Sequence, residues 1–287
     1  MKAGERLPAW LRRPIAQPGQ AVAVAEMLDE LSLHTVCQSA KCPNRGECFS
    51  AGTATFLIMG DACTRGCRFC AVETRPPAPL DLDEPRRVGE AAATLGLRHV
   101  VITSVTRDDL ADGGAAHFVE VIRAVRAAVP DAAVEVLTSD FAGRYADVDT
   151  VVAARPDVFN HNLETVPRLY AEVRPGADYA RSLAVLARVR ETQLGLPTKS
   201  GLMLGLGETP DEVIDVMSDL LDSGVSMLTL GQYLQPSSGH LPVVDYVEPD
   251  VFARLSREAY RLGFSAVASA PFVRSSYHAA ELATGEA

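Results

Sequence analysis

From residue 56 onward, short apolar runs alternate with longer amphipathic segments, and this alternation limits the possible fold more than any other feature. Strands rich in Val, Ile and Leu are predicted at 56–60, 99–105, 133–139, 157–164, 200–206 and 226–234. Helical spacing of apolar residues predicts helices near 84–96, 114–128, 142–154, 178–193, 210–223 and 249–262. Apolar strands joined by helices are typical of a parallel sheet that helices cover. A last run, 264–271, is either a seventh strand or a C-terminal return.

The order of elements is compatible with two architectures. Six strand–helix units are too few for a closed (β/α)8 barrel but suit a partial TIM-type barrel, (β/α)6. A doubly wound open sheet gives the same order, so periodicity leaves both open. In either case the active site is expected at the edge where the parallel strands end, which we call the carboxyl edge. Polar residues lie at these predicted strand ends: Thr103, Ser104, 138–140, 160–164 and 232–235.

Charge and hydropathy exclude some classes of partner. The formal net charge of −10 argues against broad nucleic-acid binding, which needs a basic surface. No apolar run approaches the roughly 20 residues of a membrane span, so no membrane partner is expected. The first 20 residues are rich in Pro and Arg, lack the apolar segment of a secretory signal and suggest an extended arm. A cytoplasmic location is the expectation, and residues 21–33 have the spacing of a short helix.

All six cysteines lie between residues 37 and 70, in two groups of three. Cys37, Cys42 and Cys48 have the spacing C-x4-C-x5-C, and the second group, "CTRGCRFC", has the spacing C-x3-C-x2-C. A disulfide framework belongs to short secreted chains with cysteines spread across the fold. Reduced, metal-binding thiolates are therefore the better interpretation of both groups.

The second group consists of Cys63, Cys67 and Cys70, in a loop after the first predicted strand. A structural zinc site has four ligands, and iron–sulfur clusters are usually held by four thiolates. Three thiolates on a [4Fe–4S] cube leave one iron without a protein ligand, where a small molecule can bind. The spacing therefore favours such a cluster over a structural metal.

This second group resembles the hallmark of the radical S-adenosylmethionine (SAM) superfamily, C-x3-C-x-aromatic-C, with Phe69 at the aromatic position. The resemblance implies a partial or full (β/α) barrel and a cluster whose open iron binds the amino and carboxylate groups of SAM. In that superfamily an electron passed through the cluster cleaves SAM to methionine and a 5′-deoxyadenosyl radical.

The chain between about residues 30 and 280 resembles the lipoyl synthase family of this superfamily. The resemblance lies in both cysteine groups and in "TSVTRDDLADGGA", "FNHNLETV", "SGLMLGLGE", "GQYLQPS" and "PFVRSSYHA". Phe49 and Thr198 depart from the family pattern, which has Trp and more often Val there. The resemblance implies a radical SAM sulfurtransferase that inserts sulfur at C6 and C8 of a protein-bound octanoyl-lysine to give the lipoyl group.

The first cysteine group is implied by the resemblance to hold an auxiliary [4Fe–4S] cluster, whose sulfides become the two lipoyl sulfurs. Its fourth ligand is a serine of "RSSY", residues 274–277. Because neighbouring residues in an extended segment point to opposite sides, one serine reaches the iron, and we favour Ser276 over Ser275. An oxygen on iron is a weak, exchangeable ligand, which suits a cluster that is opened during turnover. The expected organisation is one structural unit: an N-terminal extension (1–52), the barrel (53–263) and a C-terminal segment (264–287).

Several polar residues at strand ends are candidates for SAM contacts. Arg174 is the candidate for the SAM carboxylate, because a guanidinium holds a carboxylate bidentately. Asn162 and Glu164 are candidates for the ribose hydroxyls or the amino group, and Thr103 and Ser104 for further contacts. Each also has a structural reading: strand-end caps, or a surface arginine before Pro175. Met203 is a candidate for packing on adenine, although a buried Met is more often core.

The resemblance also implies partners. These are octanoylated carrier proteins (the lipoyl domains of 2-oxoacid dehydrogenases and the glycine cleavage H protein), an electron donor and a cluster-repair protein. Lys199 and Arg107 near strand ends are weak candidates for contact with an acidic carrier, and we interpret both as solvated surface charges. His161 and His278 lie inside family-like motifs, and ordinary structural roles are expected for the remaining four histidines, His34, His99, His117 and His240.

Two other functions remain compatible with the sequence. One is a radical SAM enzyme with an auxiliary cluster that sulfurates a different substrate. The other is a non-enzymatic zinc- or cluster-binding module. Iron content, SAM cleavage and the sulfurated product distinguish the three.

Overall fold

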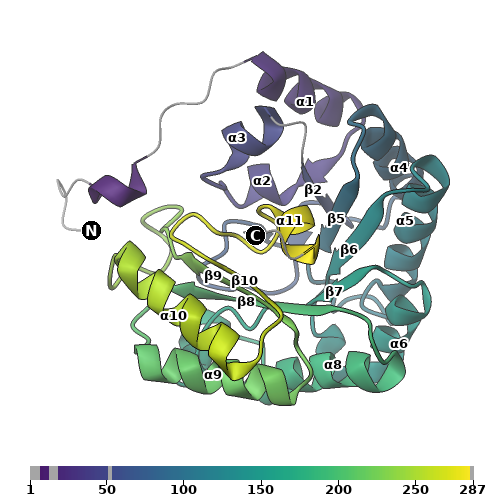
Figure 1. Cartoon of the computed structure of the whole chain (residues 1–287). Coiled ribbons are helices and arrows are strands. Elements are labelled where there is room, and N and C mark those ends of the chain that lie inside the picture. Colours follow the sequence, from purple (N-terminus) through teal and green to yellow (C-terminus); the bar gives the residue numbers. More distant parts are fainter. Residues whose placement is uncertain (1–6, 13–18, 51–53, 285–287) are drawn as a thin grey trace.

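The computed structural model describes residues 7–12, 19–50 and 54–284, and its centre is one curved eight-stranded sheet (Figure 1). Seven strands are parallel and adjacent in chain order: β2 (Thr55–Ile58), β5 (His99–Ser104), β6 (Ala133–Leu137), β7 (Val158–Asn160), β8 (Thr198–Leu204), β9 (Met227–Gln232) and β10 (Ala266–Ser269). A short strand, β1 (His34–Thr35), pairs antiparallel with β2.

This strand order decides between the two predicted architectures. A doubly wound sheet reverses its strand order at a switch point, whereas here each strand lies beside its predecessor in the chain. The order runs from β1 at one edge to β10 at the other, so the sheet is an open barrel. The prediction of a partial (β/α)6 barrel is confirmed, and the run 264–271 supplies the seventh parallel strand.

The predicted helices form a layer on the outer, convex face of the sheet (Figure 1). They are α4 (Glu84–Thr94), α5 (Ala115–Ala128), α6 (Tyr145–Ala153), α8 (Tyr179–Thr192), α9 (Pro210–Asp222) and α10 (Pro249–Leu262). Local signals begin two of them. Thr209 and Glu212 form a reciprocal capping box at α9, and the Asp178 carboxylate accepts the backbone N–H of Arg181 at α8.

Short elements were not predicted, because three or four residues carry no periodicity. They include α7 (Tyr170–Val173) and the 3-10 turns at Ala9–Leu11, Phe141–Gly143 and Pro167–Leu169. The turn at 141–143 displaces the start of the helix predicted at 142–154 to Tyr145. The strand predicted at 157–164 ends at Asn160, and Glu164, which has a left-handed backbone (φ 68°), pairs once more with Leu202 of β8 as an isolated bridge.

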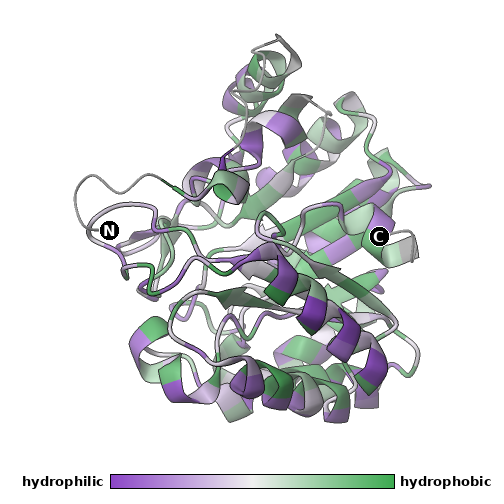
Figure 2. Cartoon of the chain, turned by 60° about the vertical axis from the view of Figure 1, so that its left-hand side comes forward, coloured by the Kyte–Doolittle hydropathy of each residue, from purple (hydrophilic) through white to green (hydrophobic). Residues whose placement is uncertain are grey.

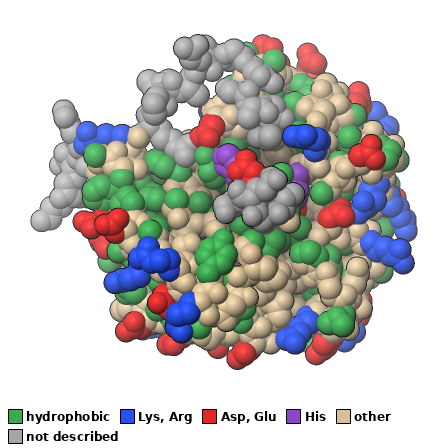
Figure 3. Space-filling view, in the orientation of Figure 1, with side chains coloured by type: hydrophobic (Ala, Val, Ile, Leu, Met, Phe, Trp, Pro, Cys, Tyr) green, Lys and Arg blue, Asp and Glu red, His purple; other side chains and the backbone are tan. Residues whose placement is uncertain are grey.

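The hydrophobic core lies mainly between the sheet and the outer helices, where hydrophobic strand residues face the inner sides of the helices (Figure 2). All four residues of β2 and all six of β9 are buried, as expected for parallel strands covered on both faces. Charged side chains of both signs are interspersed over the described part of the outer surface (Figure 3). Among the described helices, none is both long and apolar enough to cross a membrane.

The N-terminal extension packs beside β2 and contains α1 (Gly19–Glu30), α2 (Val36–Ser39) and α3 (Arg45–Ser50) (Figure 1). The helix predicted at 21–33 is therefore present and ends at Glu30. The prediction of an extended arm over residues 1–20 falls largely outside the described residues, since of these only 7–12, 19 and 20 are described.

The C-terminal segment covers the inner, concave face of the sheet. Its helix α11 (Ala279–Thr284) lies in the middle of the barrel in Figure 1 and contacts β5 and β10. Leu282 forms a small buried cluster with Val158, Met227 and Ala266, one residue from each of three strands. The chain therefore fills part of the barrel interior with its own last residues.

Candidate functional site

The second cysteine group lies at the carboxyl edge, in a loop that folds back on itself through the short parallel strands β3 (Ala62–Cys63) and β4 (Glu73–Thr74). The Cys63 Sγ accepts backbone N–H groups of Arg65 (3.4 Å) and Thr106 (3.3 Å). In the described part of the chain, no three His, Cys, Asp or Glu side chains form a group fit for a metal ion.

The acid–base behaviour of the other two thiols tests whether this loop suits a cluster. Burial raises the pKa of Cys67, against the effect of the Arg174 guanidinium, and burial raises the pKa of Cys70 to about 12. These thiols therefore keep their protons at neutral pH unless a strongly positive partner displaces them, as iron does. The three sulfur atoms are not gathered around one ion position, but Cys63 and Cys67 are near enough to raise the pKa of Cys70, and three soft donors suit an iron–sulfur cluster in their chemistry.

Three of the predicted SAM-contacting residues meet beside these thiols. The Asn162 Nδ2 donates to Glu164 Oε1 (3.0 Å), and Arg174 Nη1 donates to the carbonyls of Asn162 (2.9 Å) and Leu163 (3.1 Å). Burial raises the pKa of Glu164, against the charge of Arg174, and Glu164 in turn acts on Cys67 and Cys70. Arg174 Nε is buried without a partner, so part of its guanidinium remains available for a ligand.

The remaining candidates differ in how buried they are and in whether their polar groups are already hydrogen-bonded. Phe69 and Met203 are partly buried and pack against the same core cluster. The Thr103 hydroxyl is buried and donates to the carbonyl of Leu137 (3.0 Å), so it is already used in joining β5 to β6. Ser104 ends β5 and is partly exposed at the carboxyl edge.

The first cysteine group lies against the C-terminal segment. Cys37 is in α2, Cys48 is in α3, and Cys42 lies between them. Burial raises the pKa of Cys37, against hydrogen bonds from Thr55, and the Thr55 hydroxyl also donates to Ser276 Oγ (2.8 Å). Thr55 therefore brings Ser276 to the side of Cys37.

Two further hydrogen bonds tie this segment to the N-terminal extension. Asn44 Nδ2 donates to the carbonyl of Phe272 (2.8 Å), and the Tyr277 hydroxyl donates to Glu47 (2.7 Å). Ser275 points the other way, toward the barrel interior, where it contacts Asn160 and Asn162. Nothing in the sequence near Thr55 or Asn44 indicates this role, because both contacts join positions more than 200 residues apart.

The interpretation of Lys199 and Arg107 as surface charges is wrong, since their exposed fractions are 0% and 2%. Lys199 pairs with the buried carboxylate of Glu135 in the barrel interior. Arg107 donates to the carbonyls of Met59 (3.2 Å) and Ala78 (3.0 Å) and pairs with Asp109 (2.9 Å). Because Met59 precedes the second cysteine group and Ala78 follows it, Arg107 closes the base of the cysteine loop.

We expect Arg107→Met to lower the free energy of unfolding by about 3 kcal/mol, because it leaves two carbonyls without a charged donor in a buried place. Urea unfolding under anaerobic conditions measures the loss. Arg123→Met is the matched control: Arg123 is exposed and pairs only with Glu120, so a change within about 0.5 kcal/mol is expected. Equal losses in the two variants would contradict the proposed closure.

Among the histidines, His161 is fully enclosed, and its Nδ1 donates to the carbonyl of Thr138 (2.9 Å). The expected structural roles of His99 and His117 are confirmed by buried contacts with Glu135 and Glu84. His240 hydrogen-bonds the carbonyl of Cys70 (3.1 Å), while the partly exposed His278 pairs with Glu281.

Burial lowers the pKa of His161 to about 4, with the positive charge of Arg174 acting in the same direction. Between pH 6.5 and 4 the unfolded chain binds this proton and the folded chain does not, so stability falls as pH falls through this window. The loss amounts to up to about 3 kcal/mol. His161→Gln, which cannot titrate, is expected to flatten the pH dependence of urea unfolding between pH 6.5 and 4. An unchanged slope would refute the assignment.

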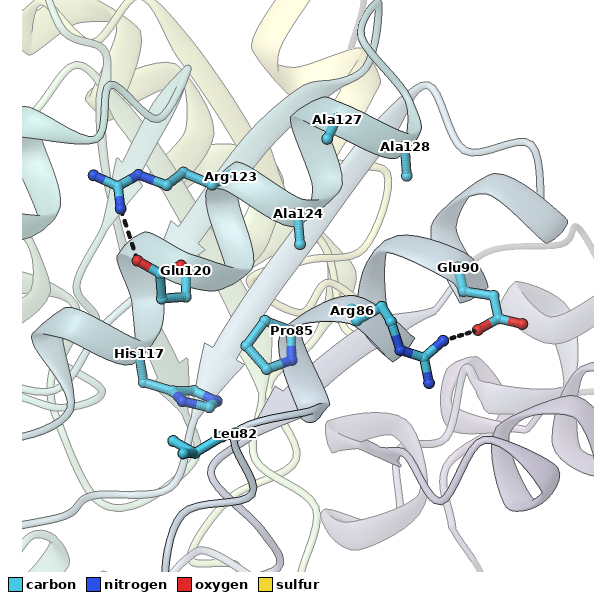
Figure 4. Close-up of a pocket in the computed structure, with 10 residues that line it drawn as sticks. All are labelled: Leu82, Pro85, Arg86, Glu90, His117, Glu120, Arg123, Ala124, Ala127 and Ala128. Atoms are coloured by element: carbon cyan, nitrogen blue, oxygen red, sulfur yellow. Dashed lines mark hydrogen bonds and ion pairs between the residues drawn. The ribbon is translucent and has the colours of Figure 1, made fainter.

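A surface hollow lies on the outer face between α4 and α5, away from both cysteine groups (Figure 4). Its walls carry the ion pairs Arg86–Glu90 and Arg123–Glu120 and a floor of small residues that includes Ala124. The hollow is open and contains no cysteine. Its residues offer no group that the cysteine chemistry requires, so we place the candidate site at the carboxyl edge.

The sequence has known relatives over most of its length. Residues 57–220 match the radical SAM superfamily. The chain is 57% identical to a lipoyl synthase of Caldanaerobacter subterraneus subsp. tengcongensis, over 96% of each chain. It is 58% identical to a lipoyl synthase of Thioalkalivibrio sulfidiphilus, over 96% of this chain and 86% of the relative.

Solved structures resemble the fold at low sequence identity. Streptococcus suis SuiB bound to S-adenosylmethionine matches 76% of this chain and 51% of its own, with a TM-score of 0.56 and 13% identity. Methylornithine synthase (PylB) matches 84% of this chain and 73% of its own, with a TM-score of 0.54 and 15% identity. At these identities the likeness concerns the fold alone.

Proposed function

Since the chain belongs to the lipoyl synthase family of the radical SAM superfamily, we propose that it inserts two sulfur atoms into an octanoyl chain carried on a carrier-protein lysine. The insertion takes place at C6 and C8 and yields the lipoyl group. The C–H bonds at these carbons have no neighbouring group that makes them acidic, so a general base cannot break them. A carbon radical abstracts the hydrogen atom directly, and two abstractions require two SAM molecules per lipoyl group.

The observation that carries this proposal is the contact of Thr55 with both Cys37 and Ser276. It supports a site with three thiolates and one hydroxyl, from Cys37, Cys42, Cys48 and Ser276. A purely structural site needs no such weak fourth donor. The separate group of Cys63, Cys67 and Cys70 offers three thiols, which would leave one iron of a cluster open for SAM.

When bound, a [4Fe–4S] cluster on Cys63, Cys67 and Cys70 would supply the electron that cleaves SAM, and one on the first group would supply the sulfur. The protein's own part is binding and orientation. Arg174 would bind the SAM carboxylate through the part of its fork that has no partner, and Asn162 and Glu164 would bind the amino group or the ribose. The partly buried Phe69 and Met203 would border the adenine, with Thr103 and Ser104 near the strand end.

The partners follow from the same chemistry. The substrate is an octanoylated lipoyl domain of a 2-oxoacid dehydrogenase or the glycine cleavage H protein. An electron donor is needed for each SAM cleavage, and a repair protein is needed because the sulfur source is consumed. We propose the cytoplasm as the place where these partners are met.

A product assay tests the proposal. Anaerobically prepared enzyme with SAM, reductant and an octanoylated peptide is expected to add two sulfur atoms to the peptide, measured by mass spectrometry. Iron and sulfide analysis is expected to give roughly eight of each per chain, as two clusters require. Production of 5′-deoxyadenosine with no sulfurated peptide would instead favour a radical SAM enzyme for another substrate. Zinc, or about four irons with no SAM cleavage, would favour a binding module.

A further inference from the structure

A buried polar layer crosses the concave face of the barrel, between the apolar cluster around Leu282 and the carboxyl edge. Its centre is Glu135 on β6, whose Oε1 pairs with the Lys199 ammonium (2.5 Å) and whose Oε2 contacts the His99 ring (3.1 Å). Glu135 and Lys199 are both fully buried. Burial opposes the charged form of Glu135, but Lys199 and His99 outweigh it and hold its pKa below the usual value.

The layer continues from this ion pair to the C-terminal segment. Asn160, fully buried on the strand between the two charges, donates through Nδ2 to Glu135 Oε1 (3.2 Å) and to Ser275 Oγ (2.6 Å). The Ser275 hydroxyl in turn donates to Asn162 Oδ1 (3.0 Å). Ser275 is therefore hydrogen-bonded to two asparagines, Asn160 at the end of β7 and Asn162 two residues further on.

The strand pairing explains why these groups meet. Asn160 is opposite Lys199 on β8 and opposite Leu137 on β6, and Glu135 lies two residues before Leu137. Paired residues and residues two apart in a strand share one face. Glu135, Asn160 and Lys199 therefore point together into the concave side, which the outer helices do not cover and the C-terminal segment does.

We propose that Ser275 is a positioning residue that turns its neighbour Ser276 toward Cys37. Two hydrogen bonds fix Ser275 to the barrel. Both serines are the central residues of a turn closed by the Tyr277 N–H donating to the carbonyl of Arg274 (3.0 Å), so the extended segment expected from the sequence is absent. This turn places the next side chain on the other side, where Thr55 donates to it. The inference rests on the proposed function, since it takes Ser276 as the oxygen ligand of the first cysteine group. It assigns the two serines of this segment different tasks.

The layer suits this task because it is rigid. Ser275 is hydrogen-bonded to Asn160, which is itself hydrogen-bonded to the buried ion pair, so the Ser275 side chain has little freedom to move. Buried polar networks of this kind favour one arrangement of their groups. Residues that orient a metal ligand typically change metal affinity by about 10- to 100-fold when they are removed. Loss of the Ser275 hydroxyl is therefore expected to loosen Ser276 without removing a donor from the metal.

The test uses the full-length chain with Cys63→Ala, Cys67→Ala and Cys70→Ala, so that all bound iron belongs to the first cysteine group. Four forms are compared after anaerobic reconstitution with ⁵⁷Fe: this parent, Ser275→Ala, Ser276→Ala and Ser269→Ala. Ser269→Ala is the matched control, because its hydroxyl donates to the carbonyl of Phe252, outside the polar layer. The readouts are the Mössbauer signal of an oxygen-bound iron and the rate of iron loss to a chelator.

We expect Ser276→Ala to lose the oxygen-bound iron signal and Ser275→Ala to retain it in only part of the molecules, with iron loss about tenfold faster than in the parent. Ser269→Ala is expected to match the parent, and Ser275→Thr, which keeps a hydroxyl, to return toward it. In the metal-free chain, Ser275→Ala is expected to speed backbone amide exchange over 272–278. That readout needs no cluster and also reports whether the variant folds.

The outcomes separate the two levels of the proposal. If Ser276→Ala alters the signal and Ser275→Ala leaves both signal and iron loss at parental values, the positioning role is refuted and the ligand assignment is supported. If Ser276→Ala itself matches the parent, the ligand assignment fails, and the positioning role fails with it.

Discussion

Cys63→Ala is expected to abolish SAM cleavage altogether, whereas Cys37→Ala is expected to leave SAM cleavage intact and to abolish sulfur insertion. The first change removes one of three thiols at the carboxyl edge, and its sulfur is the one that accepts two backbone N–H groups. The second removes a thiol that lies beside Ser276 in a different part of the fold. The two sites are built on separate segments, so each loss stays local.

Two measurements on the same samples separate the effects: 5′-deoxyadenosine by chromatography and sulfurated octanoyl peptide by mass spectrometry. Cys48→Ala serves as a second variant of the first group and is expected to behave as Cys37→Ala does. Sulfur insertion by Cys37→Ala would show that the first cysteine group is not the sulfur source. Residual SAM cleavage by Cys63→Ala would remove the second group from its proposed role.

Lys199→Met is expected to lower the free energy of unfolding by about 3–5 kcal/mol, because the fully buried Glu135 carboxylate loses its ammonium partner and keeps only the His99 ring and the Asn160 amide. Methionine has a similar length, so the loss reflects the missing charge more than missing volume. Anaerobic urea unfolding at pH 7, followed by circular dichroism, measures the change.

The double variant Lys199→Met, Glu135→Leu is the decisive control. Replacing both members of a buried ion pair with apolar residues is often close to neutral, so much of the lost stability is expected to return. Arg188→Met, which breaks a partly exposed pair with Asp149, is expected to cost no more than about 1 kcal/mol. A double variant no more stable than Lys199→Met would contradict the charge-pair explanation.

The order of strands and helices was predictable because long amphipathic helices and apolar strands leave a periodic pattern in the sequence. The choice between barrel and doubly wound sheet was not, because it depends on which strands are neighbours, and periodicity records only what each strand is. Short elements such as β3 and α7 were missed for a different reason. An element of two to four residues is too short to show a periodic pattern.

The residues of the candidate site also differ in how far the sequence predicts them. The spacing of Cys63, Cys67 and Cys70 predicts a cluster by itself, whereas the cluster on Cys37, Cys42 and Cys48 is implied by the family resemblance, and both stay predictions. Lys199 and Arg107 were misread because a charged residue is usually exposed, and only the fold supplies the carboxylate and carbonyls that let these two be buried. The opposite directions of Ser275 and Ser276 were expected from an extended segment, but the two serines lie in a turn, and their partners Asn160 and Thr55 become visible only in three dimensions.

The contact between Asn44 and Phe272 joins residues 228 positions apart, so the segment that carries the first cysteine group is held by a segment that is synthesised much later. During synthesis the barrel strands emerge from the ribosome before the segment that carries Ser276. Iron bound at Cys37, Cys42 and Cys48 before that point would have three protein ligands and would lack the proposed fourth one. In the proposed site the donor set is complete only once Ser276 has been synthesised, more than 200 residues after the last of its three cysteines.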